Sequence, residues 1–154
     1  REITTGKIIV QSTPPRMEGK NMLAMMWKPI LGSMVLAAVV IVVSAFLAAP
    51  QALVLFAVLL GLTAGVYIGF CLADGRSWEQ GIELLVGLLF FAVAAAGVWI
   101  SPFVLVGGVV AHAAWNMSHQ PRLVSTQLVM WYPPIGAMFD MIMAGYIAVR
   151  WTLL

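Results

Sequence analysis

The stretch that decides the fold is residues 52–73, ALVLFAVLLGLTAGVYIGFCLA, which contains no charged side chain. An α-helix rises about 1.5 Å per residue, so about 20 apolar residues cross the hydrocarbon core of a bilayer. Similar apolar stretches lie on both sides of it, at about 30–49, 80–100, 102–118 and 133–154. The pattern predicts an all-α, polytopic transmembrane bundle of about five spans over residues 30–154, preceded by an extramembrane arm over residues 1–29.

The composition is that of a membrane protein. Of the 154 residues, 62% are hydrophobic and 9% are charged, and the mean hydropathy is +1.01. Soluble domains carry about 25% charged residues, so no second soluble domain is expected here. Cys71 is the single cysteine, which excludes a disulfide framework within the chain. A net charge of +2 without a basic surface argues against a nucleic-acid partner.

The breaks between the apolar stretches contain residues that end or start helices. Pro50 follows the first stretch, and Asp74-Gly75-Arg76-Ser77 follows the second. Trp131-Tyr132-Pro133-Pro134 precedes the last, where the aromatic pair suits the headgroup region and the prolines suit a helix start. Ser101-Pro102 joins the third and fourth stretches so tightly that we expect an antiparallel hairpin.

The positive charges predict how the chain is oriented. With five spans, the arm and the loops near residues 76 and 122 share one side of the membrane, and only Arg150 lies on the other side. The residues on the first side are Arg1, Lys7, Arg16, Lys20, Lys28, Arg76 and Arg122. The positive-inside rule therefore predicts a multi-pass protein with its N-terminus in the cytoplasm and its C-terminus outside. Val43-Ser44-Ala45 also suits a signal-peptide cleavage site, but the long polar arm before it argues against one.

A polar stripe crosses the fourth span, Pro102–Ser118. Gly108, His112 and Asn116 recur every four residues and His119 follows three residues later, so all four share one helix face. Polar side chains are costly within a bilayer and are usually functional there. The stripe therefore marks either a site or a place where helices are held together.

Polar residues of the neighbouring spans reach a similar depth. Asp140 lies seven residues after Pro133, and Tyr67 lies seven residues before Asp74, which places each about 10 Å below the cytoplasmic surface. Glu83 enters the third span at a shallower level, with Glu79 one helical turn before it. These residues predict a polar cluster in the cytoplasmic third of the bundle.

Two interpretations of this cluster are a helix lock and a metal site. In the first, His112, Asn116 and Asp140 hydrogen-bond across helices and fix their register, with each bond contributing about 0.6–2 kcal/mol. In the second, a metal ion binds His112, Asp140 and Glu83. Two imidazoles seven residues apart on a helix are too far apart for one ion, so His119 would stay at the edge of the site.

A third interpretation covers proton relay, transport, or axial ligation of a haem or another macrocyclic pigment by His112. Gly108, one turn before His112, would let a flat ring approach the backbone. A separate feature concerns packing, since Gly61, Gly65 and Gly69 recur every four residues and predict the close approach of a neighbouring helix.

The motifs around the stripe resemble those of a known family. His112-Ala-Ala-Trp115-Asn116-Met-Ser-His119, then Trp131-Tyr-Pro-Pro134, then Asp140, resemble the pattern H-A-x-W-D-x-x-H-H, W-Y-P-P and an aspartate in the last helix. That pattern belongs to a family of small bacterial integral membrane proteins with no established activity. Residues 65–76 and Glu83 add to the likeness, which covers about residues 60–150.

The resemblance implies a membrane fold and a bacterial inner-membrane location. The chain departs from the family pattern twice, because Asn116 stands where the family has Asp and Gln120 stands where it has a second His. If those positions bind metal in relatives, this chain has exchanged an anionic ligand and an imidazole for neutral amides. The departures therefore argue against catalysis here.

The N-terminal arm indicates partners. It has too few apolar residues for a core of its own, and Pro14-Pro15 stiffens it. We therefore expect it to lie against other membrane subunits. The sequence predicts an accessory or structural subunit of a larger membrane complex rather than an enzyme. The alternative is a metal-, haem- or pigment-binding protein or enzyme that uses His112 with Asp140.

Overall fold

The computed structural model describes residues 19–74, 77–119, 128–129 and 131–154. Within these residues the chain forms helices and no strand, as the sequence predicted. The helices are α1 (Gly19–Ala45), α2 (Ala49–Asp74), α3 (Ser77–Trp99), α4 (Pro102–Ser118) and α5 (Tyr132–Thr152).

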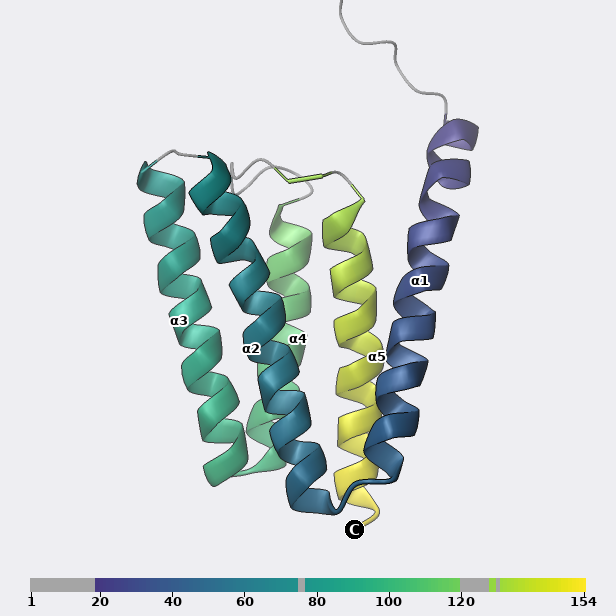
Figure 1. Cartoon of the computed structure of the whole chain (residues 1–154), viewed down its shortest axis with the longest axis vertical. Helices are drawn as coiled ribbons and strands as arrows, with labels where there is room; N and C mark the ends of the chain where they lie inside the picture. The colour runs from purple at the N-terminus through teal and green to yellow at the C-terminus, as the bar shows by residue number, and fades with distance from the viewer. Residues whose placement is uncertain (1–18, 75–76, 120–127, 130) are drawn as a thin grey trace, which may run out of the picture.

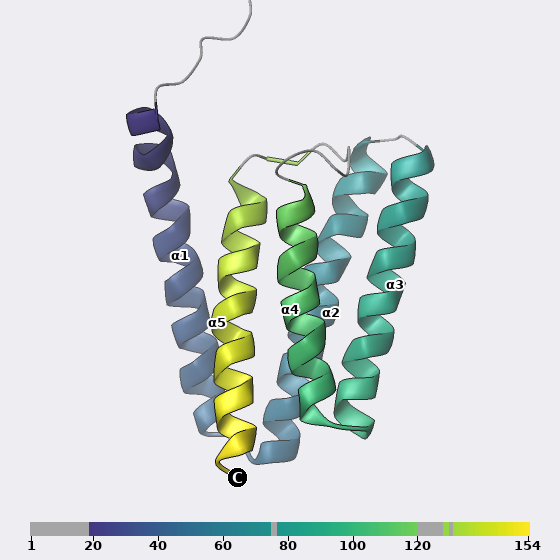
Figure 2. The same ribbon diagram turned by 180° about the vertical axis from the view of Figure 1, so that it is seen from behind.

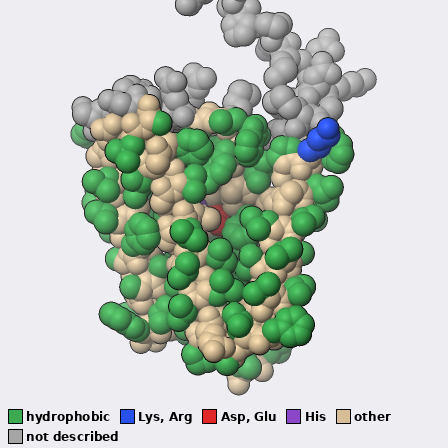
Figure 3. Space-filling model, viewed as in Figure 1, with side chains coloured by type: hydrophobic (Ala, Val, Ile, Leu, Met, Phe, Trp, Pro, Cys, Tyr) green, Lys and Arg blue, Asp and Glu red, His purple; other side chains and the backbone are tan. Residues whose placement is uncertain are grey.

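Three of these helices are long and apolar enough to cross a membrane. Among the described residues the segments that meet both requirements are Trp27–Ala45, Ala49–Ala73 and Trp78–Trp99. Their outward side chains are hydrophobic, and Figure 3 shows hydrophobic groups over most of one face. Helix α4, which has 17 residues, and α5, which contains Asp140 and Arg150, are not among the three. This composition fits a helical membrane protein.

The helices form an up-and-down bundle (Figure 1). Helix α1 begins, α2 ends, α3 begins, α4 ends and α5 begins at the end drawn uppermost, here called the upper end. Helix α2 packs on α3, α4 packs on α5, and α3 forms with α4 the antiparallel hairpin that the sequence predicted. Figure 2 shows α1 against the far side of α5, where it makes most of its contacts.

The first helix begins earlier than the first predicted span. Residues 19–29, predicted as part of the arm, form the first turns of α1, and Pro29 lies inside the helix. Hydropathy places a span boundary where charged side chains stop, whereas the backbone continues as a helix through Lys28 because lysine is a good helix former. The remainder of the predicted arm, residues 1–18, lies outside the described residues.

Hydrogen bonds tie α1 to α5 at two levels. Ser33 Oγ donates to the backbone oxygen of Ile135 at 3.0 Å. Near the lower end, the Arg150 guanidinium donates to the backbone oxygens of Ser44 at 2.6 Å and Leu47 at 2.9 Å. The last carbonyls of a helix have no partner within it, and Arg150 adds a donor to Ser44, which also accepts from Leu47 N–H, and to Leu47 just beyond the end of α1.

Close packing of α2 on α3 depends on glycine at one position of the predicted run. A Cβ at Gly61 would lie 2.8 Å from Cε1 of Phe91, so the ring of α3 rests on the glycine. At Gly65 the nearest Phe91 atom would be 4.0 Å away, and at Gly69 no atom lies within 4 Å. Of the three glycines, the first is therefore the one at which the predicted close approach to α3 occurs.

Candidate functional site

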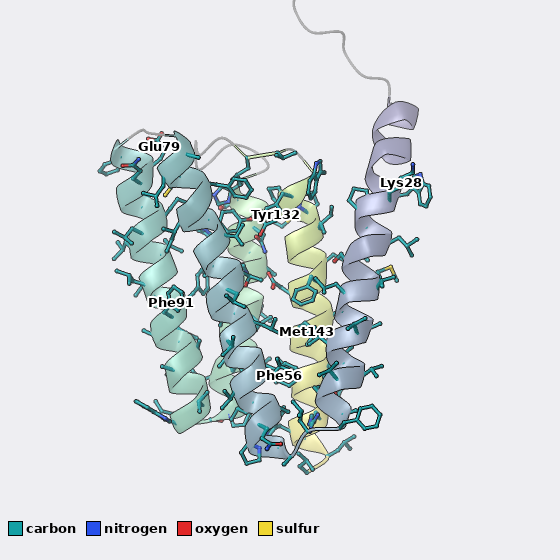
Figure 4. All side chains as sticks on the ribbon, in the orientation of Figure 1. Lys28, Phe56, Glu79, Phe91, Tyr132 and Met143 are labelled. Atoms are coloured by element: carbon teal, nitrogen blue, oxygen red, sulfur yellow. The ribbon has the colours of Figure 1, made fainter. Side chains whose placement is uncertain are left out.

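Four helices bring six buried polar side chains together in the upper half of the bundle. Each is at most 7% exposed. Figure 4 shows oxygen and nitrogen atoms gathered between α2, α4 and α5 near the label of Tyr132. The set, here called the polar cluster, consists of Tyr67 of α2, Glu83 of α3, His112 and Asn116 of α4, His119 just beyond α4, and Asp140 of α5.

The centre of the polar cluster is the contact between His112 and Asp140. His112 Nδ1 lies 2.8 Å from Asp140 Oδ2, and both side chains are buried. When Asp140 is a carboxylate it only accepts hydrogen bonds, and the proton of a neutral His112 imidazole then lies on Nδ1 and the lone pair on Nε2. Nε2 is buried and has no hydrogen-bond partner among the described residues. The ring is thus held at one nitrogen and free at the other.

Asn116 links this pair to α2. Its Nδ2 donates to Asp140 Oδ2 at 2.6 Å, and its Oδ1 accepts from the Tyr67 hydroxyl. These two bonds fix which end of the amide is nitrogen and which is oxygen. Gly136 makes the arrangement possible, because a Cβ there would lie 3.0–3.1 Å from three atoms of the Asn116 amide.

A second His–carboxylate pair lies closer to the upper end. His119 Nε2 is 2.8 Å from Glu83 Oε1, and His119 Nδ1 is 2.9 Å from the backbone oxygen of Trp115. The Trp115 indole donates to Glu83 Oε2 at 3.3 Å. A carbonyl oxygen only accepts, so Nδ1 carries a proton and a further proton lies between Nε2 and Oε1. Both ring nitrogens of His119 are therefore bonded, unlike those of His112.

Aromatic rings separate the two pairs. The Tyr67 ring centroid lies 4.7 Å from that of His119 and 5.9 Å from that of His112. On the α3 side, the Phe90 ring meets the His112 ring edge to face at 4.9 Å. The free nitrogen of His112 therefore belongs to a ring that is packed among aromatic groups.

The structure distributes the predicted metal ligands over two pairs. Glu83, expected beside His112, contacts His119, and His119 is buried rather than at the edge of a site. The reason is depth, since Glu83 enters α3 at a shallower level than His112 and matches His119, two turns further along α4. In the described parts of the chain, no three His, Cys, Asp or Glu side chains gather as metal ligands.

Gly108, which one interpretation placed beside a flat ring, has a packing role in the structure. A Cβ at this position would lie 2.5 Å from Cγ1 of Val93 and 3.1 Å from Cδ2 of Leu60. Side chains of α3 and α2 therefore fill the space next to Gly108. The glycine lets three helices approach one another below the polar cluster.

Two other predicted cluster residues lie at the upper end. Glu79 is in the first turn of α3 (Figure 4). Asp74 is the last residue of α2, and its side chain lies outside the described part of the structure.

Sequence analysis missed the part played by Trp115 and by Gly136. The first bonds to Glu83 and the second accommodates Asn116. The position of Trp115 within the quoted motif could have indicated its role. No feature of the sequence indicates the role of Gly136, since that role depends on a contact with another helix.

Comparisons with protein-family models, with curated proteins and with solved structures find no match to this chain.

Proposed function

We propose that this chain is an integral membrane protein in which the His112–Asp140 pair takes up and releases a proton for a bound molecule. The observation that carries the proposal is the buried Nε2 of His112, which has no partner among the described residues while Asp140 holds Nδ1. A carboxylate on one imidazole nitrogen orients the ring and leaves the other nitrogen to face a bound molecule. This is the arrangement of a general base or of a proton-binding site.

The energetic cost of burying the His112–Asp140 pair within a membrane supports a functional role for it. Ionisable residues within a membrane are expensive and mark proton pathways or ligand sites. Two apolar side chains would fill the same space without the energetic cost of removing ionisable groups from water. The His119–Glu83 pair, whose ring nitrogens are both bonded, acts in this proposal as the support that positions Tyr67 and α4.

The proposal includes the topology and the family relationship that the sequence suggests. In it all five helices cross a bacterial inner membrane, and the upper end faces the cytoplasm. The positive charges near the chain's N-terminal arm and near residues 76 and 122 support this orientation. The motif around His112 and Trp131 supports membership of the small bacterial membrane-protein family.

A second candidate is an accessory subunit of a membrane complex in which the polar cluster locks the bundle. It is favoured by the way the hydrogen bonds join α2, α4 and α5 through Tyr67, Asn116 and Asp140, and α3 with the end of α4 through Glu83 and His119. Such interhelical bonds contribute about 0.6 kcal/mol on average. In this case no side chain of the cluster exchanges a proton.

Imidazole ¹⁵N NMR in lipid nanodiscs distinguishes the two candidates. The chain has two histidines, so His112→Asn and His119→Asn variants assign every signal. From about pH 5 to about pH 8, where His normally titrates, we expect the His112 signals to shift and this shift to change in Asp140→Asn. A His112 that keeps one tautomer and one charge over this range would reject the proton-exchange proposal and favour the helix lock.

A further inference from the structure

Among the described residues, the hydrogen bonds from Tyr67 to Asp140 do not form a continuous proton-conducting chain. The link from Tyr67 to Asp140 passes through the Asn116 amide. A carboxyl or imidazole group can accept a proton on one atom and release one from another, but a neutral amide does not readily do so. Asn116 therefore interrupts the relay, and a molecule that exchanges a proton with Asp140 needs another route.

The hydrogen bonds of the polar cluster use one of the two Asp140 oxygens. Both hydrogen bonds from His112 and Asn116 reach Oδ2, so Oδ1 has no hydrogen-bond donor among the described residues. Asp140 lines a cavity of about 10 Å³ between α2, α4 and α5. Its other walls are apolar and include Leu59, Leu60 and Met143. That volume accommodates the centre of about one water-sized group.

Aromatic contacts close the space between α2 and α5 above and below this cavity. At the upper end, Tyr132 packs on Tyr67 and Phe70, with ring centroids 5.7 and 5.3 Å apart. Towards the lower end, Phe56 packs on Tyr146, with centroids 6.0 Å apart. The two helices have no extensive contact between these rings, because α2 packs mainly on α3 and α5 packs mainly on α4 and α1.

The cavity lies at an opening in the hydrophobic face of the bundle. In Figure 4, Met143, which lines the cavity, lies between Tyr132 above it and Phe56 below it. Figure 3, in the same orientation, shows a hollow surrounded by hydrophobic side chains with an acidic group at its floor. Asp140 is the acidic residue that lines the cavity. The opening faces the side of the bundle rather than either end.

We infer that the opening between α2 and α5 admits the hydroxyl group of a membrane-dissolved molecule to Asp140 Oδ1. The inference rests on the proposed proton exchange and adds its route and its ligand class. The apolar walls select an apolar body, and the water-sized cavity selects a hydroxyl head. A carboxylate oxygen in apolar surroundings is stabilised by a hydrogen-bond donor, which the hydroxyl supplies.

A lipid-soluble carbodiimide tests the route. Dicyclohexylcarbodiimide reacts with protonated carboxyl groups. The acid proton moves to a nitrogen of the reagent while the carboxyl oxygen bonds to its central carbon, and the adduct rearranges to a stable N-acylurea. In nanodiscs at mildly acid pH, we expect mass spectrometry to find the adduct on Asp140 and not on buried Glu83. A charged, water-soluble carbodiimide should label Glu79, near the upper end, and leave Asp140 unlabelled.

A matched pair of tryptophan variants tests the opening itself. Leu59 lines the cavity, and Leu62 is 62% exposed and lines a different groove on the same helix. Leu59→Trp should slow the labelling of Asp140 by about tenfold or more, equivalent to about 1.4 kcal/mol, while Leu62→Trp leaves it unchanged. Equal labelling in both variants, labelling of Glu83 in place of Asp140, or no labelling of Asp140 would overturn the route.

Competition tests the ligand class. A long-chain alcohol should protect Asp140 from the carbodiimide, whereas the methyl ether of the same chain, which has no hydroxyl donor, should not. Equal protection by both would refute a hydroxyl ligand. Labelling that responds to Leu59→Trp while His112 does not titrate would contradict the proposed proton exchange and retain the route. Titration of His112 without labelling of Asp140 would contradict the route and retain the proposed proton exchange.

Discussion

Two glycines of α5 give a direct test of how the site is assembled. Gly136 faces the Asn116 amide, where a Cβ would lie 3.0–3.1 Å from three side-chain atoms, whereas a Cβ at Gly145 would meet no atom within 4 Å. We expect Gly136→Ala to push Asn116 away from Asp140 and to destabilise the protein. Gly145→Ala, the matched control on the same helix, should stabilise it.

The two effects can be given magnitudes. Alanine is favoured over glycine in a helix interior by about 0.8–1.0 kcal/mol, and this gain applies to both variants. Forcing an extra group into a packed contact costs about 1–3 kcal/mol, and this cost applies at Gly136 alone. The difference in unfolding free energy between the two variants therefore isolates the packing contact, at about 1–3 kcal/mol. The Asn116 amide belongs to a buried network, so it has little room to move.

Equilibrium unfolding in mixed detergent micelles measures the difference, and the ¹⁵N signals of His112 show whether the network changes. Gly136→Ala should shift the His112 Nδ1 signal, because Asn116 and His112 share one oxygen of Asp140. Gly145→Ala should leave that signal in place. A Gly136→Ala protein as stable as Gly145→Ala, with unchanged His112 signals, would show that Asn116 does not pack on α5 as described.

Three further changes probe separate contacts. Arg150→Ala removes the side-chain donor of the Leu47 carbonyl and one of the two donors of the Ser44 carbonyl, and it should cost about 1–3 kcal/mol in thermal unfolding, with Arg150→Lys intermediate. Tyr67→Phe leaves the Asn116 oxygen without its donor, and denaturant titration should show a loss of about 1–3 kcal/mol. Glu83→Leu alone should cost about 3–5 kcal/mol, whereas adding His119→Phe should recover most of this loss, since no unpaired buried charge remains. Additive losses in that double variant would contradict a direct pair.

Apolar runs and helix-breaking residues were enough to predict five helices, because both signals are local. Counting residues from the ends of each run also predicted that His112 and Asp140 lie at one depth, and the structure places them in contact. Depth along a helix follows from the constant rise per residue. Predicting the pairing of Glu83 with His119 also requires the rotation of α3 about its own axis, which the sequence alone does not specify.

The remaining contacts depend on which helices become neighbours. The role of Gly136 follows only from the packing of α4 against α5, and the sequence does not distinguish it from other glycines. The sequence indicates Arg150 as a charge outside the membrane, and its bonds follow only from the position of the end of α1. Helix α1 begins before the first predicted span for a different reason. A hydropathy boundary reports where apolar composition begins, and α1 continues upstream of that point as a helix with two lysines.

The two His–carboxylate pairs share their chemistry but differ in what they leave unbonded. In the His119 pair both ring nitrogens are bonded, and a tryptophan N–H reaches the carboxyl group. In the His112 pair, Nε2 and Asp140 Oδ1 each lack a hydrogen-bond partner among the described residues. If the cluster served only to lock helices, a partner for the buried Nε2 would be expected, because an unsatisfied buried polar atom costs about 1–3 kcal/mol. Retaining two open positions on one pair, beside a fully bonded one, is the arrangement expected where a molecule from outside completes the site.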